Sequence, residues 1–334
     1  MSNYIVLCFI CILVMTGCAS SEIANRNAAV EIELKPFSEQ NNQMDIDSLL
    51  SKVDSATFLI PDTIVSYYAE DACVVDDNIY ILDKSGNILV FNLSTEEFVG
   101  CLNARGKGRG EYAKPTAVSS DDTCVYVLDL TGLSILAYDK DLRFRRKINV
   151  GLPCLDFIKT ESGFLLYNLN ANEETGRIVY VDNEGKMVES FLKMPVNHNQ
   201  VLPTKHLFQR YDDAVCVIDP NSNDIYAFRK EKFEKIASLV ITNGENNGVS
   251  PVGAYMVNDM IISQYWSKFV MTNIYDMSTG VSHSGLVKIS RSLYGFMPMT
   301  QYGKCLFGLY PDMTEGKAYH LYQYHFKGRS IEPL

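Results

Sequence analysis

The sequence lacks the residue patterns of several common catalytic sites. Its 334 residues include five histidines and one tryptophan, Trp266. No His-Glu-x-x-His pair, no cysteine cluster at zinc spacing and no Gly-x-Ser-x-Gly elbow occurs in it. The apolar run over residues 5–15 is too short for a membrane-spanning helix, which needs about 20 residues. Catalysis therefore has no positive support in the sequence.

The chain also lacks an excess of positive charge, because its formal net charge is −10. A chain this acidic is a poor candidate for binding nucleic acid or an anionic bilayer surface. It has nine cysteines, of which Cys8 and Cys11 lie in the apolar run and Cys18 follows it. The other six are expected to be buried thiols that act as small hydrophobic groups, with any disulfide pairing left open.

The start of the chain predicts export and a lipid anchor. Residues 5–15 are typical of the core of a secretory signal, and the segment from Leu13 to Cys18 resembles a bacterial lipobox. Residues 1–17 are therefore predicted to be a lipoprotein signal peptide, and Cys18 to carry the lipid that holds the protein at a membrane. The alternative is an ordinary cleaved signal or a short anchor.

Residues 18–55 are predicted to be the lipidated cysteine followed by a polar tether. The stretch is rich in Ser, Asn, Gln and Glu and poor in large apolar groups, so we expect it to bury little surface. Within it, the alternation of Val30, Ile32 and Leu34 is compatible with a strand, and residues 45–52 with a short helix.

A strand-and-turn unit returns throughout the rest of the chain. It is clearest at residues 76–83, 121–129 and 212–219. The aligned last positions of six copies are separated by 46, 39, 51, 46 and 44 residues; they are Asp83, Asp129, Asn168, Asp219, Tyr265 and Leu309. A period near 45 residues is typical of β-propeller blades. Residues 56–334 are thus predicted to form an all-β, six-bladed β-propeller of four-stranded antiparallel blades, its ring closed by an N-terminal strand at residues 56–60.

Residues 103–112, Asn-Ala-Arg-Gly-Lys-Gly-Arg-Gly-Glu-Tyr, form a glycine-rich segment after an outer strand. Pro115 and a β-like run follow where a nucleotide-binding loop would begin a helix. With the lipobox, the tether and the repeats, the segment resembles the six-bladed β-propeller lipoproteins of Bacteroidetes, distant relatives of NHL and TolB-like propellers. The resemblance implies a lipid-anchored protein of the cell envelope, in the outer membrane and either periplasmic or surface-facing, and it supplies no catalytic residues.

The predicted ligand site lies where the turns after the second strands and the connections between blades emerge on one face. The residues expected to converge there are Arg105, Lys107, Arg109, Glu111, Tyr112, His206, Arg210, Tyr265, Trp266 and Tyr310. Aromatic rings offer stacking surface and cations offer anion contacts. The alternative is that these residues only cap the ring through mutual hydrogen bonds.

Two functions remain open at this point. The first is a non-enzymatic module that binds an anionic or carbohydrate-like ligand or a partner protein, with no metal or other cofactor. The alternative is a propeller enzyme of the lactonase, lyase or hydrolase type with Ca²⁺ in its central channel. The recurring Asp83, Asp129, Asn168 and Asp219 would suit that metal, although Asp and Asn also favour strand ends for turn chemistry alone.

Overall fold

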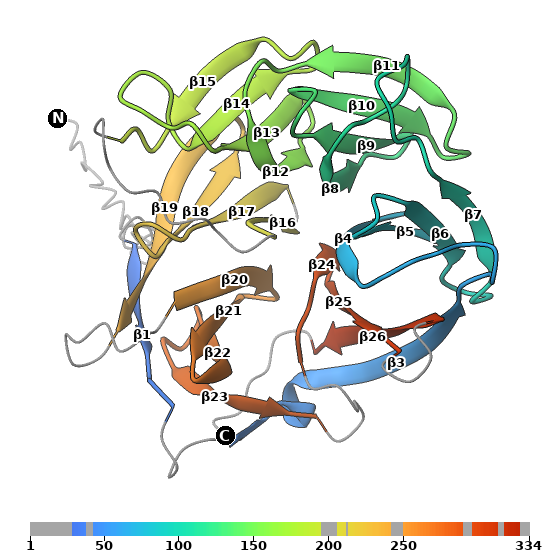
Figure 1. Ribbon diagram of the computed structural model, residues 1–334. Helices are drawn as coiled ribbons and strands as arrows, with labels where there is room; N and C mark the ends of the chain where they lie inside the picture. The colour runs from blue at the N-terminus through green and yellow to red at the C-terminus, as the bar shows by residue number, and fades with distance from the viewer. Residues whose placement is uncertain are drawn as a thin grey trace, which may run out of the picture.

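The computed structural model describes residues 29–37, 43–194, 206–211, 213–241, 250–289, 296–312 and 317–327. Within these ranges it contains 26 strands and one short 3₁₀ helix, η1 (Asp47–Leu49). The strands form six sheets arranged as blades around a central channel (Figure 1). The predicted all-β, six-bladed propeller is confirmed.

Blades 1 to 3 each consist of four consecutive antiparallel strands. Blade 1 contains β4 (Ala69–Val75), β5 (Asn78–Asp83), β6 (Ile88–Asn92) and β7 (Phe98–Leu102). Blade 2 contains β8 (Pro115–Ser120), β9 (Cys124–Asp129), β10 (Ser134–Asp139) and β11 (Phe144–Asn149). Blade 3 contains β12 (Cys154–Lys159), β13 (Gly163–Asn168), β14 (Ile178–Asp182) and β15 (Met187–Phe191).

Blades 4 to 6 each include a strand from the N-terminal part of the chain. Blade 4 contains β16 (Phe208–Tyr211), β17 (Ala214–Asp219), β18 (Asp224–Arg229), β19 (Lys232–Ile241) and, outermost, β1 (Val30–Leu34). Blade 5 contains β20 (Ser250–Val257), β21 (Met260–Ser267), β22 (Phe269–Asp276), β23 (Ser282–Lys288) and β2 (Gln43–Asp45). Blade 6 contains β24 (Thr300–Tyr302), β25 (Cys305–Pro311), β26 (Ala318–Phe326) and β3 (Leu50–Leu59).

The position of a strand within its blade explains its sequence. The second and third strands lie between two neighbouring blades, so both of their faces are buried and they read as continuous apolar runs, as in β9 and β10. The outer strand β11 alternates between exposed and less exposed residues, because one of its faces meets water. The hydrophobic core therefore consists of the layers between blades.

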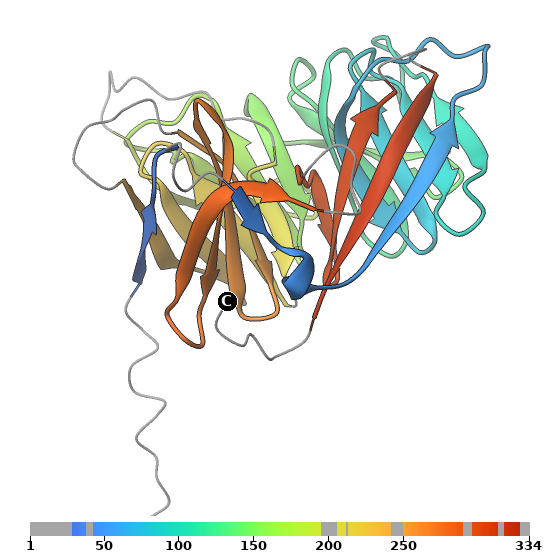
Figure 2. The same cartoon turned by 90° about the horizontal axis from the view of Figure 1, so that it is seen from below.

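The ring has two different faces. The upper face holds the turns between the second and third strands and the connections from one blade to the next. The lower face holds the two remaining turns of each blade. Figure 2 shows the ring from the side, with the upper face at the top, and Figure 1 looks onto the upper face.

An N-terminal strand closes the ring, as predicted. β3 pairs antiparallel with β26 along its length, from Leu59 opposite Ala318 to Leu50 opposite Phe326. The strand begins at Leu50 rather than at Ala56, because Leu50 packs into the core between blades 5 and 6.

The predicted tether differs from the structure over the residues that are described. β1 pairs in parallel with β19, and β2 in parallel with β23, so this segment lies along the outer edges of blades 4 and 5. Ile32 and Leu34 are buried against blade 4, which explains why the chain packs there. The strand at residues 30–34 is confirmed, whereas the helix expected at 45–52 is only the single turn η1. Cys18 lies outside the described residues.

The six cysteines that the structure describes are all free. Burial raises the pKa of the Cys154 and Cys216 thiols to about 12, as expected for thiols that act as small apolar groups. None of the helices among the described residues is long and apolar enough to cross a membrane.

Candidate functional site

The recurring residues at the ends of the second strands are buried in their own turns. Asp129 accepts hydrogen bonds from the backbone N–H groups of Ala113 (3.0 Å) and Lys114 (2.9 Å). Asp219 forms a buried ion pair with Arg177 at 2.5 Å. These side chains therefore hold turns and connections together, as the turn interpretation of their recurrence expects.

The same residues do not fit a calcium site in the channel. Asp83, Asp129, Asn168 and Asp219 do not line the channel, and their oxygens already accept hydrogen bonds in the turns. Among the described residues, no group of three or more His, Cys, Asp or Glu side chains is placed to hold a metal ion. The donor set that the Ca²⁺ alternative requires is thus not assembled by these residues.

The glycine-rich connection between β7 and β8 folds on itself. The Gly108 N–H donates to Glu111 Oε2 at 2.8 Å, and a Cβ on Gly106 would lie 1.9 Å from the same oxygen. Gly110 has a φ of 77° and packs on Phe144 of β11. The connection therefore lies at the rim between blades 1 and 2. Its cations have no carboxylate within ion-pair distance among the described residues; they are Arg105, Lys107, Arg109 and Lys114.

Three of the predicted site tyrosines are core residues. Tyr112, Tyr265 and Tyr310 are buried. The Tyr112 hydroxyl donates to the Gly86 carbonyl at 2.8 Å, and the Tyr265 hydroxyl to the Lys35 carbonyl at 2.8 Å. Burial raises the pKa of Tyr112 to about 12. Their rings are not available for stacking on a ligand, because the layers between blades need large side chains. Trp266, in contrast, is 51% exposed on the upper face.

His206 and Arg210 line the channel, but at different heights. His206 lies at the upper end of β16, where its Nδ1 is 3.2 Å from Asp71 Oδ1. Arg210 is four residues further along this strand, about 13 Å towards the lower face. The structure thus places the connection and Trp266 on one face and sets Arg210 apart from them.

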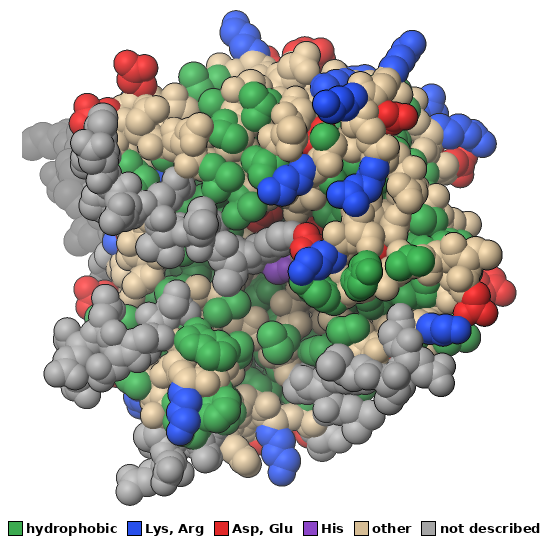
Figure 3. All heavy atoms as spheres, in the orientation of Figure 1, with side chains coloured by type: hydrophobic (Ala, Val, Ile, Leu, Met, Phe, Trp, Pro, Cys, Tyr) green, Lys and Arg blue, Asp and Glu red, His purple; other side chains and the backbone are tan. Residues whose placement is uncertain are grey.

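The upper face exposes a set of large apolar side chains. They lie in connections between blades and in the β21–β22 turn; they are Val65, Tyr67, Tyr68, Trp266, Phe269 and Met297. In Figure 3, hydrophobic and basic side chains surround a hollow at the centre of this face. Large apolar side chains exposed together on one face often mark a binding site. We call these six residues and the four cations of the β7–β8 connection the upper-face cluster.

The channel itself forms a hollow of about 390 Å³. Near its upper end, two aspartates join the innermost strands of neighbouring blades. Asp71 accepts from the N–H of Ala72 (2.8 Å) and of Val118 in blade 2 (2.7 Å). Asp156 does the same for the N–H of Phe157 in its own blade and of Leu207 at the start of blade 4, at 2.8 and 2.7 Å. Burial, followed by the charge of Asp71, raises the pKa of Asp156 to about 6.

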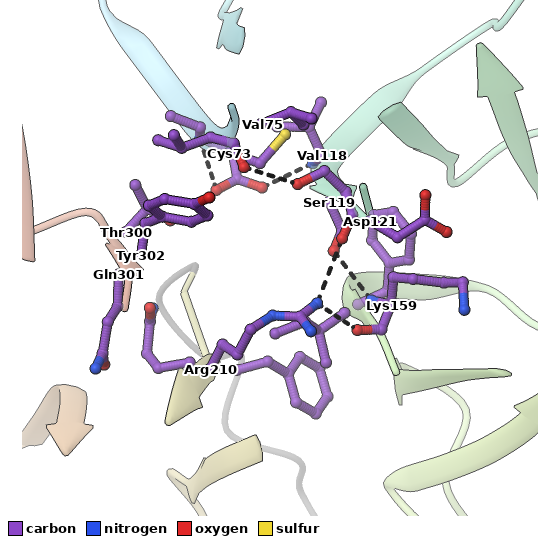
Figure 4. Close-up of a pocket in the computed structure, with 18 of the residues that line it drawn as sticks. Cys73, Val75, Val118, Ser119, Asp121, Lys159, Arg210, Thr300, Gln301 and Tyr302 are labelled. Atoms are coloured by element: carbon purple, nitrogen blue, oxygen red, sulfur yellow. Dashed lines mark hydrogen bonds between the residues drawn. The ribbon is translucent and has the colours of Figure 1, made fainter. Parts of the chain in front are cut away.

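Near the lower end of the channel, Arg210 extends across the hollow. Figure 4 shows its guanidinium between Ser119 and Lys159, with two hydrogen bonds to backbone carbonyls. Nη2 donates to the Lys159 carbonyl at 2.7 Å and to the Ser120 carbonyl at 3.3 Å. Cys73 and Tyr302 line the same hollow from blades 1 and 6.

Sequence reasoning missed the aspartates of the channel and most of the exposed aromatics. Asp71 and Asp156 each precede an apolar run and lie two repeats apart, which is a usable signal. Tyr67, Tyr68 and Phe269 lie in connections and turns outside the repeat pattern, so periodicity could not find them.

The fold and its turns define a six-bladed β-propeller. The model of the family described as domain of unknown function DUF4934 matches residues 62–311, so the chain belongs to that family. None of the curated proteins matches the chain.

Three solved structures of other proteins share the fold. A Bacteroides fragilis protein described as exported has a TM-score of 0.70 at 12% identity, over 89% of this chain and 100% of that chain. A DUF4221 family member from Bacteroides vulgatus has a TM-score of 0.55 at 7% identity, over 84% and 98%. The virginiamycin B lyase of Staphylococcus aureus has a TM-score of 0.52 at 11% identity, over 81% and 99%. At these identities the likeness is one of fold.

Proposed function

We propose that this protein is an exported, lipid-anchored and non-enzymatic binding module whose upper face holds an anionic, carbohydrate-like ligand. The observation that carries the proposal is the upper-face cluster, in which exposed aromatic side chains and cations without carboxylate partners share one face of the ring. Aromatic rings stack on the apolar faces of sugars, and cations pair with carboxylate or sulfate groups.

Export and the anchor are supported by the N-terminal signal pattern, by Cys18 and by the likeness to an exported protein of Bacteroides fragilis. The direction of β1 adds an orientation. β1 is parallel to β19 and runs from the lower towards the upper face (Figure 2). A lipid on Cys18, eleven residues before Ala29, would hold the lower face nearer the bilayer. The upper face would then point away from the membrane.

The anchor is tested in cells with Cys18→Ala and, as a matched control, Cys11→Ala. The first variant should lose metabolic acyl labelling and leave the membrane fraction, because only Cys18 is proposed to carry lipid. The second should behave as the wild type. Acyl labelling that persists in Cys18→Ala would contradict the anchor.

The ligand is tested with polygalacturonate as an anionic polysaccharide and dextran as a neutral one, both immobilised. The mature chain should bind the first, and more weakly as the salt concentration rises. Two variants, Tyr68→Ala/Trp266→Ala and Arg105→Gln/Lys107→Gln/Arg109→Gln, should each bind at least about tenfold more weakly, a loss of about 1.4 kcal/mol.

The matched control for the ligand test is Val99→Ala/Arg143→Gln, which changes exposed residues on the outer rim. This variant should retain wild-type binding. Equal binding by all variants would contradict the proposal, as would a wild type that binds neither polysaccharide.

A further inference from the structure

A second recess lies beside the lower end of the channel. A hollow of about 500 Å³ lies between blades 3 and 4 on the lower face, lined in part by Ala214, Val215 and Phe228. It shares Thr160, Glu161 and Arg210 with the channel. Arg210 therefore lies between two neighbouring hollows. None of the upper-face cluster lines either of them.

The guanidinium of Arg210 is held in place by one nitrogen only. Nη2 makes the hydrogen bonds to the carbonyls of Lys159 and Ser120. Nε and Nη1 have no hydrogen-bond partner among the described residues. Because Nη2 is fixed by two neighbouring blades, the remaining donors face the hollow in a set direction (Figure 4).

Arg210 also lacks an ion pair with any described carboxylate. Burial lowers the pKa of Arg210, while the charges of Asp121 and Asp122 oppose that effect. The Asp121 carboxylate is engaged in its own turn, where it accepts from the Tyr126 hydroxyl at 2.6 Å and the Thr123 N–H at 2.9 Å. The Arg210 side chain is nevertheless exposed to the hollow. A cation that faces a cavity without a carboxylate partner is a candidate for ligand binding.

Lys159 does not provide this function. Its Nζ bonds the Thr160 carbonyl, lies 5.3 Å from the centre of the Phe164 ring and points away from the channel axis in Figure 4. Arg210 is therefore the cation that we assign to the hollow.

We propose that the lower end of the channel is a second site, which binds a small organic anion through Arg210. The group recognised is a carboxylate or a phosphate monoester, because both are anions whose oxygens accept hydrogen bonds from the free Nε–H and Nη1–H groups of a guanidinium. The hollow of about 390 Å³ suits a molecule of monosaccharide size. This site is separate from the upper-face cluster and does not depend on the function proposed for it.

The test is calorimetric titration of the mature chain with three probes: glucuronate, glucose 6-phosphate and glucose. We expect binding of at least one of the two anions and none of glucose. The anion that binds identifies the recognised group. Arg210→Gln should weaken that binding at least tenfold, whereas Arg210→Lys, which keeps the charge but loses the guanidinium donors, should weaken it less.

Asp122→Asn is expected to strengthen binding, which a misfolded chain would not do. Asp122 is exposed near Arg210 and repels an incoming anion, so its removal should strengthen binding about two- to fivefold. Asp141→Asn, another exposed acid on the lower face of blade 2, should leave binding unchanged. The triple variant Arg105→Gln/Lys107→Gln/Arg109→Gln should also bind as the wild type.

Three results would overturn the second site. The first is that neither anion binds the wild type. The second is that a folded Arg210→Gln chain binds as the wild type does. The third, which decides the matter if Arg210→Gln fails to fold, is that Asp122→Asn does not strengthen binding.

Discussion

At the scale of the residue, Asp71 and Asp156 supply hydrogen-bond acceptors to the unpaired edges of the innermost strands. An edge strand leaves backbone N–H groups without partners, and each of these carboxylates accepts two of them, one from its own blade and one from the next. Gln301 of blade 6 also joins two blades, but as a donor: its Nε2 donates to the Met256 carbonyl of blade 5 at 2.7 Å. The channel wall is thus fastened from blade to blade by side chains.

Asp156 should make stability depend on pH in a defined direction. Its folded-state pKa is raised to about 6, so the folded chain favours the proton. This contribution to stability is fully present below the ordinary Asp pKa near 4 and is lost as pH rises through about 6. From pH 7.5 to pH 5, Asp156 should therefore add about 1 kcal/mol to the free energy of unfolding.

The measurement is urea unfolding of the wild type and Asp156→Asn at pH 5 and pH 7.5. The variant should lose about 1 kcal/mol of the pH-dependent change, because it lacks the Asp156 carboxyl group and the interaction of that group's charge with Asp71 and His206. Asp77→Asn, an exposed acid, should keep the wild-type change. An unaltered pH dependence in Asp156→Asn would show that Asp156 does not hold its proton in this range.

At the scale of the element, the N-terminal segment is a strap rather than a tether. It adds β1 to blade 4, adds β2 to blade 5 and completes blade 6 with β3. It thereby covers the outer edges of blades 4 and 5. The same segment passes from blade 4 to blade 5 and from blade 5 to blade 6, where β3 closes the ring. Ile32 and Leu34 face blade 4, where they join the core formed by blades 3, 4 and 5.

Substitution in β1 should cost substantial stability. Ile32→Ala/Leu34→Ala removes two fully buried side chains, each worth about 2–5 kcal/mol in a packed core. The free energy of urea unfolding should fall by at least about 3 kcal/mol. Glu31→Ala, on the exposed face of the same strand, should change it by less than about 0.5 kcal/mol. A double variant as stable as Glu31→Ala would mean that β1 is not packed in solution.

The elements differ in how well the sequence predicts them. The repeat period identifies the second and third strands of the blades because burial on both faces keeps them apolar. β1 is visible as the alternation of Ile32 and Leu34, whereas β2 has a single buried side chain, Met44, and leaves no pattern. Whether a tyrosine faces a ligand or the core depends on how the neighbouring blade packs against it, and the sequence does not show that packing. For this reason the sequence predicts that Tyr112 contacts a ligand, whereas the structure places it in the core.

At the scale of the whole molecule, the first part of the propeller completes its last blade. β3 precedes blade 1 in the chain and pairs with β26, so blade 6 contains both ends of the domain. Phe58 of β3 is fully buried and stacks on Phe91 of blade 1 at 4.7 Å between ring centres. The strand therefore contributes to its own sheet and to the layer between blades 6 and 1, and ring closure depends on both contacts.

A chain that begins at Ile60 should consequently have an open ring, and a separate peptide that contains β3 should bind to it. Without β3, the outer edge of β26 is unpaired and the Phe58 site is empty, so we expect a lower melting temperature and faster hydrogen exchange in β26. A peptide of residues 50–60 should add the missing strand and slow hydrogen exchange in β26, and it should raise the melting temperature only part of the way, because β1 and β2 are also absent from this chain. The same peptide with Phe58→Ala should bind more than about 100-fold more weakly, since burying the ring is worth about 3 kcal/mol or more.

The control is the same peptide with Ser55→Ala, which lies on the exposed face of β3 and should bind as the natural peptide does. If the truncated chain keeps the wild-type melting temperature, or if the Phe58→Ala and Ser55→Ala peptides bind equally well, the ring is closed by contacts other than β3.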